Sequence, residues 1–570
     1  MPKKTDGFIK GLEELFLRMA YTAREVKEMK KLLKFLFSRY ALSAVFILAE
    51  LVLLIYFLFY GYNYSGALVI LTGIIDVLVI ISLINRETNP EFKLTWLAVV
   101  TMLPVVGGAL YIIFSQRRLT RREARLLSGI ADGLLENKKS SLDEERSLCS
   151  LGRLSEKSEL GGGRALSILK DDGLASLYSD CPASYYDSGE KFFEALLDRI
   201  KSAEKYIFLE YFIVEDGALF RRIHKELVKK AKAGVEVRLL YDDIGSMNTL
   251  PKGFDKRMRS EGISCYRFAR VTARLTSSHN NRDHRKICVI DGKYAFTGGA
   301  NIADEYTNER VRFGHWKDGG VEVTGDAVRG FTRLFLILYD FTAGSISDYD
   351  RFLPPLRQAE KRGPEADGKS TDEVKTLSDE REKDALSQGF VIPFGSGPAP
   401  AYREPVGKNI LMNIIEMSNR YLYVTTPYLI IDYELTEALK SAAKRGVDVR
   451  IITPHIPDKK LIKIMTKGSY SALLGAGVRI FEYTPGFIHE KLVVCDDICA
   501  VSGTINFDYR SLVHHFEDGL WLFMHPEIIK MRSSFLKTED SSHEILKEDA
   551  KLGPFEKIVK DLVKIFAPLL

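Results

Sequence analysis

The sequence predicts an α/β protein with two similar halves behind an apolar N-terminal region. Beyond residue 160, short β-like runs alternate with amphipathic helical patterns, and this alternation is typical of α/β folds. The pattern occurs twice in the chain. The run that begins at Glu204 is similar to the run from Asn419, 215 residues later, and the run from Ala233 is similar to the run from Arg445, 212 residues later.

We expect the two halves to be pseudo-symmetric α/β lobes at residues 160–350 and 388–570. In each copy a glycine, Gly234 or Gly446, closes a helix ahead of a β-branched strand. Residues 356–386 are rich in charged residues and glycine and poor in aromatic residues, so they are predicted to form a flexible linker between the lobes.

The N-terminal region contains three apolar stretches, at residues 42–60, 67–84 and 94–114. Each is close to the roughly 20 residues that a helix needs to cross a bilayer. We therefore expect residues 41–126 to form a membrane region with two or three hydrophobic helices. Residues 1–40 combine lysines with helical apolar spacing, which indicates either a helix on an anionic membrane surface or an ordinary solvated helix.

Basic clusters lie on both sides of this region, and they limit its topology. They comprise Lys30, Lys31, Lys34 and Arg39 before it, and Arg117, Arg118, Arg121, Arg122 and Arg125 after it. Both flanks are therefore expected on the cytoplasmic side, which three full spans cannot satisfy. Either one stretch is re-entrant or interfacial, with Asp76, Pro104 or Gly107–Gly108 as the irregular point, or the N-terminus lies outside. We expect a multi-pass protein of the cell membrane with cytoplasmic catalytic lobes.

Composition excludes several other classes. The net charge of +5 is small for 570 residues, so a nucleic-acid partner is not expected. The six cysteines show no paired spacing, so a disulfide framework or a zinc site is not expected, and we predict no metal and no other cofactor. These cysteines are Cys149, Cys181, Cys265, Cys288, Cys495 and Cys499.

The chemistry is carried by the motif His-x-Lys-(x)4-Asp, which occurs once in each half. The copies, 205 residues apart, are His284, Lys286 and Asp291 in the first half and His489, Lys491 and Asp496 in the second half. One copy would be a weak signal, but two copies at equivalent places in a repeat are specific. Each motif runs into an apolar strand and a turn, which predicts a hairpin.

The spacing of residues within the motif predicts different roles for its members. A histidine and a lysine two residues apart on a strand point to the same face. The aspartate lies five residues beyond the lysine, at the opposite parity and beside the turn. We therefore expect the His–Lys pairs to meet the substrate, and Asp291 and Asp496 to have an orienting or structural role.

Two such pairs that face one another predict phosphodiester chemistry. An imidazole can attack phosphorus or donate a proton near neutral pH, and a lysine can stabilise charge on the non-bridging oxygens. Asn301 and Asn506, which follow the motifs in similar contexts, are candidate donors to the same oxygens. Gly299 allows close backbone approach, and Thr504 takes its place in the second half.

A nucleophilic imidazole also needs its second nitrogen held by a partner. Asp318 lies 34 residues after His284, and Glu517 lies 28 residues after His489. We predict that these carboxylates orient the histidines, with Asp318 serving the first half and Glu517 the second. The alternative is that both are ordinary surface acids.

These motifs resemble the phospholipase D superfamily, and within it the bacterial cardiolipin synthases. The resemblance rests on the paired motifs, on the sequences around Asn281, Gly298, Glu210, Thr426 and Asn506, and on the stretch from Asn89 to Arg118. It covers nearly everything from about residue 75 onward. It implies two α/β lobes, each with a mixed sheet flanked by helices, that share one active site. It also implies that His284 is the nucleophile and His489 the general acid, although the near-symmetric motifs leave this assignment open.

The implied reaction joins two phosphatidylglycerol molecules into cardiolipin and releases glycerol through a phosphohistidine intermediate. The expected partners are a phospholipid substrate and the membrane, and the sequence leaves the oligomeric state open. A membrane-bound phospholipase D hydrolase, or a phosphatidyltransferase with another donor or acceptor, carries the same motifs. A nuclease is a further alternative, disfavoured by the apolar stretches and by the lack of an extended basic stripe.

Overall fold

A computed structural model gives the fold of the chain and describes the greater part of it. The described residues are 66–86, 89–103, 106–114, 121–140, 175–179, 181–270, 281–354, 389–398, 401–402 and 404–566, together with Val52 and Tyr56. The predicted N-terminal segment 1–40 and the predicted linker 356–386 lie outside them, as does nearly all of the apolar stretch 42–60. The chain divides into two compact units, the first comprising residues 1–85, 99–116 and 271–277, and the second comprising 86–98, 117–270 and 278–570.

In the first unit, helix α3 (Gly66–Asn85) covers the second apolar stretch. The third stretch is divided between α4 (Pro90–Met102) and α5 (Val106–Phe114). A Cβ atom on Gly107 would lie 2.5 Å from the carbonyl oxygen of Val99. Residues eight apart in a continuous helix are separated by about 12 Å. Helix α5 therefore turns back on the end of α4. The third apolar stretch is interrupted between these two helices, next to the glycine pair at which the sequence indicated an irregularity. Among the described residues, no helix is both long enough and apolar enough to cross a membrane.

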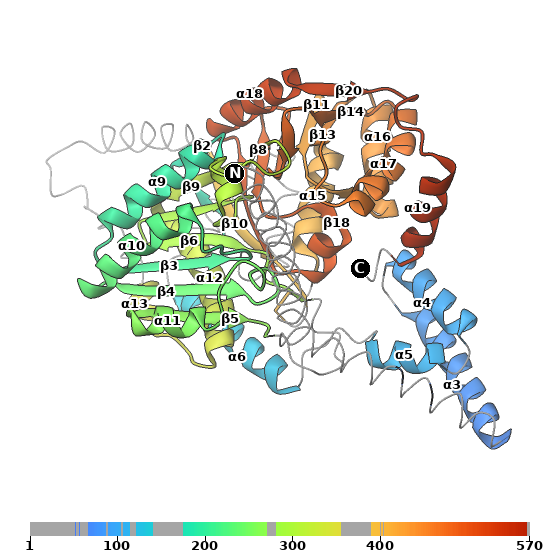
Figure 1. Ribbon diagram of the computed structural model, residues 1–570, viewed down its shortest axis with the longest axis horizontal. Coiled ribbons are helices and arrows are strands. Elements are labelled where there is room, and N and C mark those ends of the chain that lie inside the picture. Colours follow the sequence, from blue (N-terminus) through green and yellow to red (C-terminus); the bar gives the residue numbers. More distant parts are fainter. Residues whose placement is uncertain are drawn as a thin grey trace, which may run out of the picture. The chain divides into compact units, whose positions relative to one another are not determined.

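The second unit contains two large mixed sheets. The strands of the first sheet are, in spatial order, β2 (Ala183–Tyr186), β9 (Gly320–Thr324), β7 (Tyr294–Gly298), β6 (Lys286–Ile290), β3 (Tyr206–Tyr211), β4 (Glu236–Asp242) and β5 (Ile263–Phe268). The β3–β4 and β4–β5 pairs are parallel, and the other pairs are antiparallel. Figure 1 shows several of these strands in green.

The second sheet repeats this order and adds a strand at each edge. Its strands are β1 (Tyr178–Ser179), β10 (Phe390–Ser396), β19 (Glu517–Phe523), β17 (Cys499–Gly503), β16 (Leu492–Cys495), β11 (Tyr421–Thr425), β13 (Asp448–Pro454), β14 (Arg479–Tyr483) and β20 (Ser542–Ile545). Again only the pairs β11–β13 and β13–β14 are parallel. The repeat found in the sequence is therefore a repeat of mixed sheets.

Helices cover both faces of the sheets. The first lobe contributes α6 (Arg121–Ser140), α9 (Gly189–Ser202), α10 (Ala218–Lys232), α11 (Phe254–Ser260), α12 (Val328–Ala343) and α13 (Tyr349–Phe352). The second lobe contributes α15 (Val406–Met417), α16 (Tyr433–Lys444), α17 (Lys460–Gly475), α18 (Glu527–Asp540) and α19 (Pro554–Phe566). Alternate residues of β3 belong to two different apolar cores, Ile207 and Leu209 to one and Tyr206 and Phe208 to the other. Both faces of this strand are buried, which explains its continuous apolar run.

The two lobes share their core. Every residue of helix α12 from Val328 to Asp340 is buried, and the helix packs on both the first sheet and strand β10 of the second sheet. Gly330 makes this possible, because a Cβ atom there would lie 2.8 Å from the Cβ of Pro393. Strand β1, which precedes the first sheet in the chain, pairs with β10 of the second sheet.

Two short parallel pairings also cross between the lobes. Strand β8 (His315–Lys317) pairs with β15 (Gly486–Ile488), and Asp283 forms an isolated bridge with Phe516. A further short pair, β12 (Leu429–Ile430) with β18 (Phe507–Asp508), lies within the second lobe. The two cross-lobe pairings lie next to the predicted histidines.

The two motif aspartates have the same structural contacts. Asp291 accepts hydrogen bonds from the backbone N–H groups of Glu204, Lys205 and Tyr206 at 2.7 to 2.9 Å. Asp496 accepts from those of Asn419, Arg420 and Tyr421 over the same range. Each aspartate therefore ties its hairpin turn to the start of the neighbouring strand, β3 or β11.

Replacing either aspartate should destabilise the fold. In Asp496→Ala, three backbone N–H groups lose a charged acceptor, and we expect the free energy of unfolding to fall by about 2 kcal/mol. Asp496→Asn is the matched control, because an amide oxygen still accepts and asparagine tolerates the positive φ of 56°. Thermal unfolding of the detergent-solubilised chain measures the difference. Equal stability of the alanine and asparagine variants would contradict this bracing role.

Candidate active site

His284 lies two residues before the start of strand β6, beside the second lobe. Its backbone N–H donates to the carbonyl oxygen of Phe516 at 2.8 Å. This pairing sets the imidazole next to the residue after Phe516, and the Nδ1 of His284 lies 2.8 Å from Oε2 of Glu517. The turn before the histidine is fixed by Asp242 at the end of β4, which binds the Arg282 guanidinium at 2.7 Å and the Asp283 N–H at 3.0 Å.

His489 lies in the equivalent place in the other lobe. It follows β15, and its backbone N–H donates to the carbonyl oxygen of Lys317 at 2.8 Å. Its Nδ1 lies 2.8 Å from Oδ2 of Asp318. Both histidines and both carboxylates are buried.

The structure therefore brings Asp318 and Glu517 to the histidines, but it corrects the predicted pairing. Glu517 contacts His284, and Asp318 contacts His489, so each carboxylate comes from the lobe opposite to its histidine. The prediction was wrong because it paired residues by their separation along the chain. The short parallel pairings between the lobes bring together residues that are 233 and 171 positions apart.

The two lysines meet in the same site. Lys286 donates to the carbonyl oxygen of His284 at 2.7 Å, and Nζ of Lys491 lies 3.0 Å from Nε2 of His489. Burial lowers the pKa of Lys286 to about 8 and that of Lys491 to about 7. The charge of Lys286 also lowers the pKa of Lys491, so the cations of the two halves lie close enough to repel one another.

Burial also keeps both histidines neutral. It lowers the pKa of His284 to about 3 and holds the pKa of His489 well below its usual value. Although burial opposes its ionisation, Glu517 keeps a pKa below its ordinary value because the hydrogen bond from His284 favours the ionised carboxylate. An ionised carboxylate only accepts hydrogen bonds, so Nδ1 of His284 carries the proton and its Nε2 presents a free lone pair.

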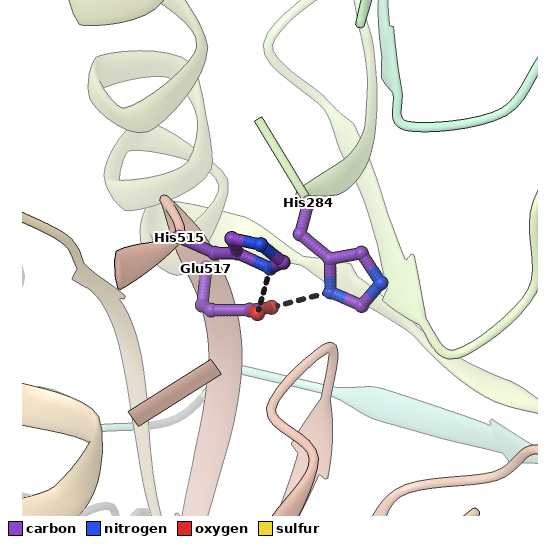
Figure 2. A group of neighbouring side chains, drawn as sticks. All are labelled: His284, His515 and Glu517. Atoms are coloured by element: carbon purple, nitrogen blue, oxygen red, sulfur yellow. Dashed lines mark hydrogen bonds and ion pairs between the residues drawn. The ribbon is translucent and has the colours of Figure 1, made fainter. Parts of the chain in front are cut away.

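The surroundings of the two histidines differ. Glu517 accepts a further hydrogen bond from the Thr504 hydroxyl, and its other oxygen lies 3.6 Å from Nδ1 of His515 (Figure 2). His284 has the phenyl ring of Phe212 beside it, at 5.0 Å between centroids, whereas His489 has several aromatic rings, among them Tyr306 and Trp316 at 5.3 and 5.8 Å. The site is therefore pseudo-symmetric in its backbone but not in its side chains.

The remaining predicted residues lie around this centre. A Cβ atom on Gly299 would lie 2.8 Å from the carbonyl oxygen of His489 and 2.9 Å from Oδ2 of Asp318, so only glycine fits there. Asn301 accepts from the Ile213 N–H at 3.0 Å and donates to the Tyr306 hydroxyl at 2.7 Å, which gives its side chain a bracing role. Asn506 is buried, and its Oδ1 has no hydrogen-bond partner within the described part of the chain.

One group of side chains could hold a metal ion. In the described part of the chain, His284, His515 and Glu517 present ligand atoms that all lie within 4.8 Å of one another. The same three groups are joined by the hydrogen bond and the ion pair given above.

Comparisons with known proteins agree with this geometry. A model described as the phospholipase D-like domain of cardiolipin synthase matches residues 196–311 and 411–538, and a phospholipase D-nuclease N-terminal model matches residues 74–116. A cardiolipin synthase of Alkalihalophilus pseudofirmus is 31% identical over 511 residues, which cover 87% of this chain and 92% of the relative. The chain belongs to the cardiolipin synthase family.

Two other similarities accompany this one. An uncharacterized protein of Streptococcus mutans is 36% identical over 492 residues, which cover 86% of this chain and 99% of the relative. The crystal structure of a Haemophilus influenzae phosphatidylserine synthase matches with a TM-score of 0.48 and 16% identity, over 68% of this chain and 92% of that one.

In this member of the cardiolipin synthase family, the sequence did not reveal the buried charges behind the site. Arg285, the middle residue of the first motif, is fully buried and donates to the carbonyl oxygen of Leu334 and the hydroxyl of Tyr402 at 2.7 and 2.6 Å. Asp518 accepts from the backbone N–H of Lys286 at 3.0 Å. An arginine two residues before the apolar run from Ile287 to Ile290 was the available signal for Arg285.

The pKa values predict the pH dependence of kcat/KM. Burial raises the pKa of Asp318 to about 6, so protonation below that pH removes the acceptor for His489 and activity should fall. Above pH 7 to 8, Lys491 and Lys286 lose their charge, and activity should fall again. Lys491→Arg should move the alkaline limb to higher pH, because a guanidinium stays protonated. An alkaline limb that does not move in the arginine variant would show that Lys491 does not set it.

Proposed function

We propose that this chain is a cardiolipin synthase that transfers a phosphatidyl group from one phosphatidylglycerol molecule to the glycerol hydroxyl of another. The observation that carries the proposal is the buried centre in which two histidines, each held by a carboxylate of the opposite lobe, face two lysines. Membership of the cardiolipin synthase family supports the choice of substrate.

In the first step, Nε2 of His284 attacks the phosphorus of the first phosphatidylglycerol. The P–O bond to the headgroup glycerol breaks, and His489, which takes up a proton when the anionic phosphodiester binds, donates that proton to the leaving oxygen. The product is a phosphatidyl-histidine, and free glycerol leaves. Lys286 and Lys491 stabilise the charge on the non-bridging oxygens, and Glu517 stabilises the positive charge that develops on the His284 ring.

In the second step, His489 takes the proton of a headgroup hydroxyl on a second phosphatidylglycerol. That oxygen attacks the phosphorus, the P–N bond breaks, and cardiolipin is released. The structure supports His284 as the nucleophile because Glu517 is ionised and is held by two further groups, Thr504 and His515. A fixed anion beside Nδ1 favours a ring that becomes positively charged.

The reaction is tested with purified protein in micelles that contain phosphatidylglycerol alone. We expect cardiolipin and glycerol in equal amounts, and loss of turnover in both His284→Ala and His489→Ala. A labelled phospho-enzyme that accumulates in His489→Ala and is absent from His284→Ala identifies His284 as the nucleophile.

The other outcomes discriminate between the alternatives. Phosphatidic acid without cardiolipin would indicate a hydrolase, and a reaction that needs another lipid would indicate a different donor or acceptor. Cleavage of nucleic acid without lipid turnover would indicate a nuclease. Each of these results rejects the synthase proposal.

We further propose that the apolar N-terminal stretches hold the enzyme at the cell membrane with its lobes on the cytoplasmic side. The third stretch is divided between α4 and α5, and Gly107 lies against Val99 near the end of α4, so this stretch is not one continuous helix and need not cross the bilayer. Whether the earlier stretches cross twice or not at all, both basic flanks then lie on the cytoplasmic face.

Reporter fusions test this topology. Fusions before Leu42 and after Arg125 should both report the cytoplasm, because the basic residues of both flanks are retained there. A fusion after Phe114 should give the same result if α4 and α5 form a re-entrant hairpin. An extracytoplasmic reading after Arg125 would reject the proposed placement of the lobes.

A further inference from the structure

Helix α19 at the end of the described chain has an apolar stripe that is exposed and that none of the described elements covers. The helix spans Pro554–Phe566. Its residues Phe555, Ile558, Leu562 and Ile565 recur at helical spacing, and they are 76, 59, 57 and 37% exposed. Four exposed apolar side chains in one row on a single helix are not the scattered apolar residues of an ordinary surface.

A different side of the helix attaches it to the second lobe. Val563 packs against Met465 of α17 and against Tyr509, and the aliphatic stem of Lys560 lies over Gly468 of α17. Figure 1 shows α19 and α17 next to one another. The second lobe therefore packs against one face of α19 and leaves the apolar stripe exposed.

The attachment also connects α19 with two neighbouring elements. The hydroxyl of Thr95 in α4 donates to the carbonyl oxygen of Ile565 at 2.6 Å, and Glu91 of the same helix accepts from the N–H of Tyr433 at 3.1 Å. Leu94 and Tyr433 are themselves 63 and 67% exposed. Exposed apolar residues thus gather where α19, the first turns of α4 and the start of α16 meet.

This place lies close to the catalytic segment. Tyr509, which contacts α19, is three residues beyond Asn506, and strand β18 lies between them. If a membrane surface holds α19, it therefore also positions the segment of the second lobe that directly follows Asn506, the predicted donor to the phosphoryl oxygens.

We propose that α19 is an interfacial helix whose stripe of Phe555, Ile558, Leu562 and Ile565 inserts among the acyl chains of the membrane that supplies the lipid substrate. An apolar stripe bordered by lysines, here Lys557 and Lys564, is the pattern of helices that lie in the plane of an anionic bilayer. The helix is about 20 Å long and about 10 Å wide. Its stripe is thus far smaller than the roughly 800 Å² per partner of a stable protein interface.

The functional consequence rests on the proposed lipid substrate, but the placement of the helix does not. The placement is tested by an environment-sensitive fluorophore on the full chain in phosphatidylglycerol vesicles, at F555C, at L562C and, as control, at K557C on the polar side. All three cysteine variants are made in a chain that also carries Cys149→Ser. The other five native cysteines are buried and are left in place. We expect nitroxides on the lipid acyl chains to quench the probes at 555 and 562 several-fold more than the probe at 557.

Two results would overturn the proposal. Equal quenching of all three probes by a water-soluble quencher would show that the stripe stays in water. Blue-shifted emission at 555 and 562 without quenching from the lipid would show that another segment of the protein, or a second copy, covers it.

Turnover provides the second measurement. Leu562→Glu should lower cardiolipin formation several-fold on vesicles and leave it unchanged with a short-chain, monomeric phosphatidylglycerol. Ile346→Glu is the matched control, because Ile346 is 66% exposed and lies outside α19. An equal loss on both substrates would show that the variant damages the lobe itself. Failure of the parent enzyme to make cardiolipin would reject the proposed function and leave the quenching result standing.

Discussion

The exchange of backbone hydrogen bonds between the lobes is the constraint on which the site depends. The N–H of His284 donates to Phe516, and the N–H of His489 donates to Lys317, each across the boundary between the lobes. Each donor is the histidine of a motif, and each acceptor immediately precedes a carboxylate residue. A displacement of one lobe relative to the other would therefore separate both histidines from their carboxylates together.

This arrangement explains why the protein buries so many charged groups. A lone carboxylate or ammonium in a dry interior is very unfavourable, whereas paired and hydrogen-bonded charges are tolerated. Here Glu517 and Asp318 oppose Lys286 and Lys491, and Arg285 faces Glu210 and Asp518 behind them. The shared core around α12 holds the lobes in the one arrangement that satisfies these pairs.

The sequence predicted what depends on local spacing and missed what depends on contact between the lobes. The place of Asp291 and Asp496 beside their hairpin turns follows from local spacing. The strand expected through each His–Lys pair does not extend that far, because His284 lies before β6, and His489 and Lys491 lie between β15 and β16. The pairing of Asp318 with His489 does not follow from local spacing, because no local pattern shows which lobe supplies the partner. His515 was missed for the same reason, since its equivalent in the first lobe is Trp316 and its role is visible only beside Glu517 (Figure 2).

The charge balance of the site indicates how a neutral histidine becomes a proton donor. With two lysines, two carboxylates and two neutral imidazoles, the centre carries no net charge before substrate enters. A phosphodiester adds one negative charge in a buried space, where it raises the pKa of the nearest basic groups. The pKa of His489 is lowered by burial and then by Lys491 and Lys286. The bound anion opposes all three effects, so we expect it to raise the pKa of His489 most. In the proposed mechanism, substrate binding and proton uptake are therefore coupled, so that His489 is charged when the phosphate is in place.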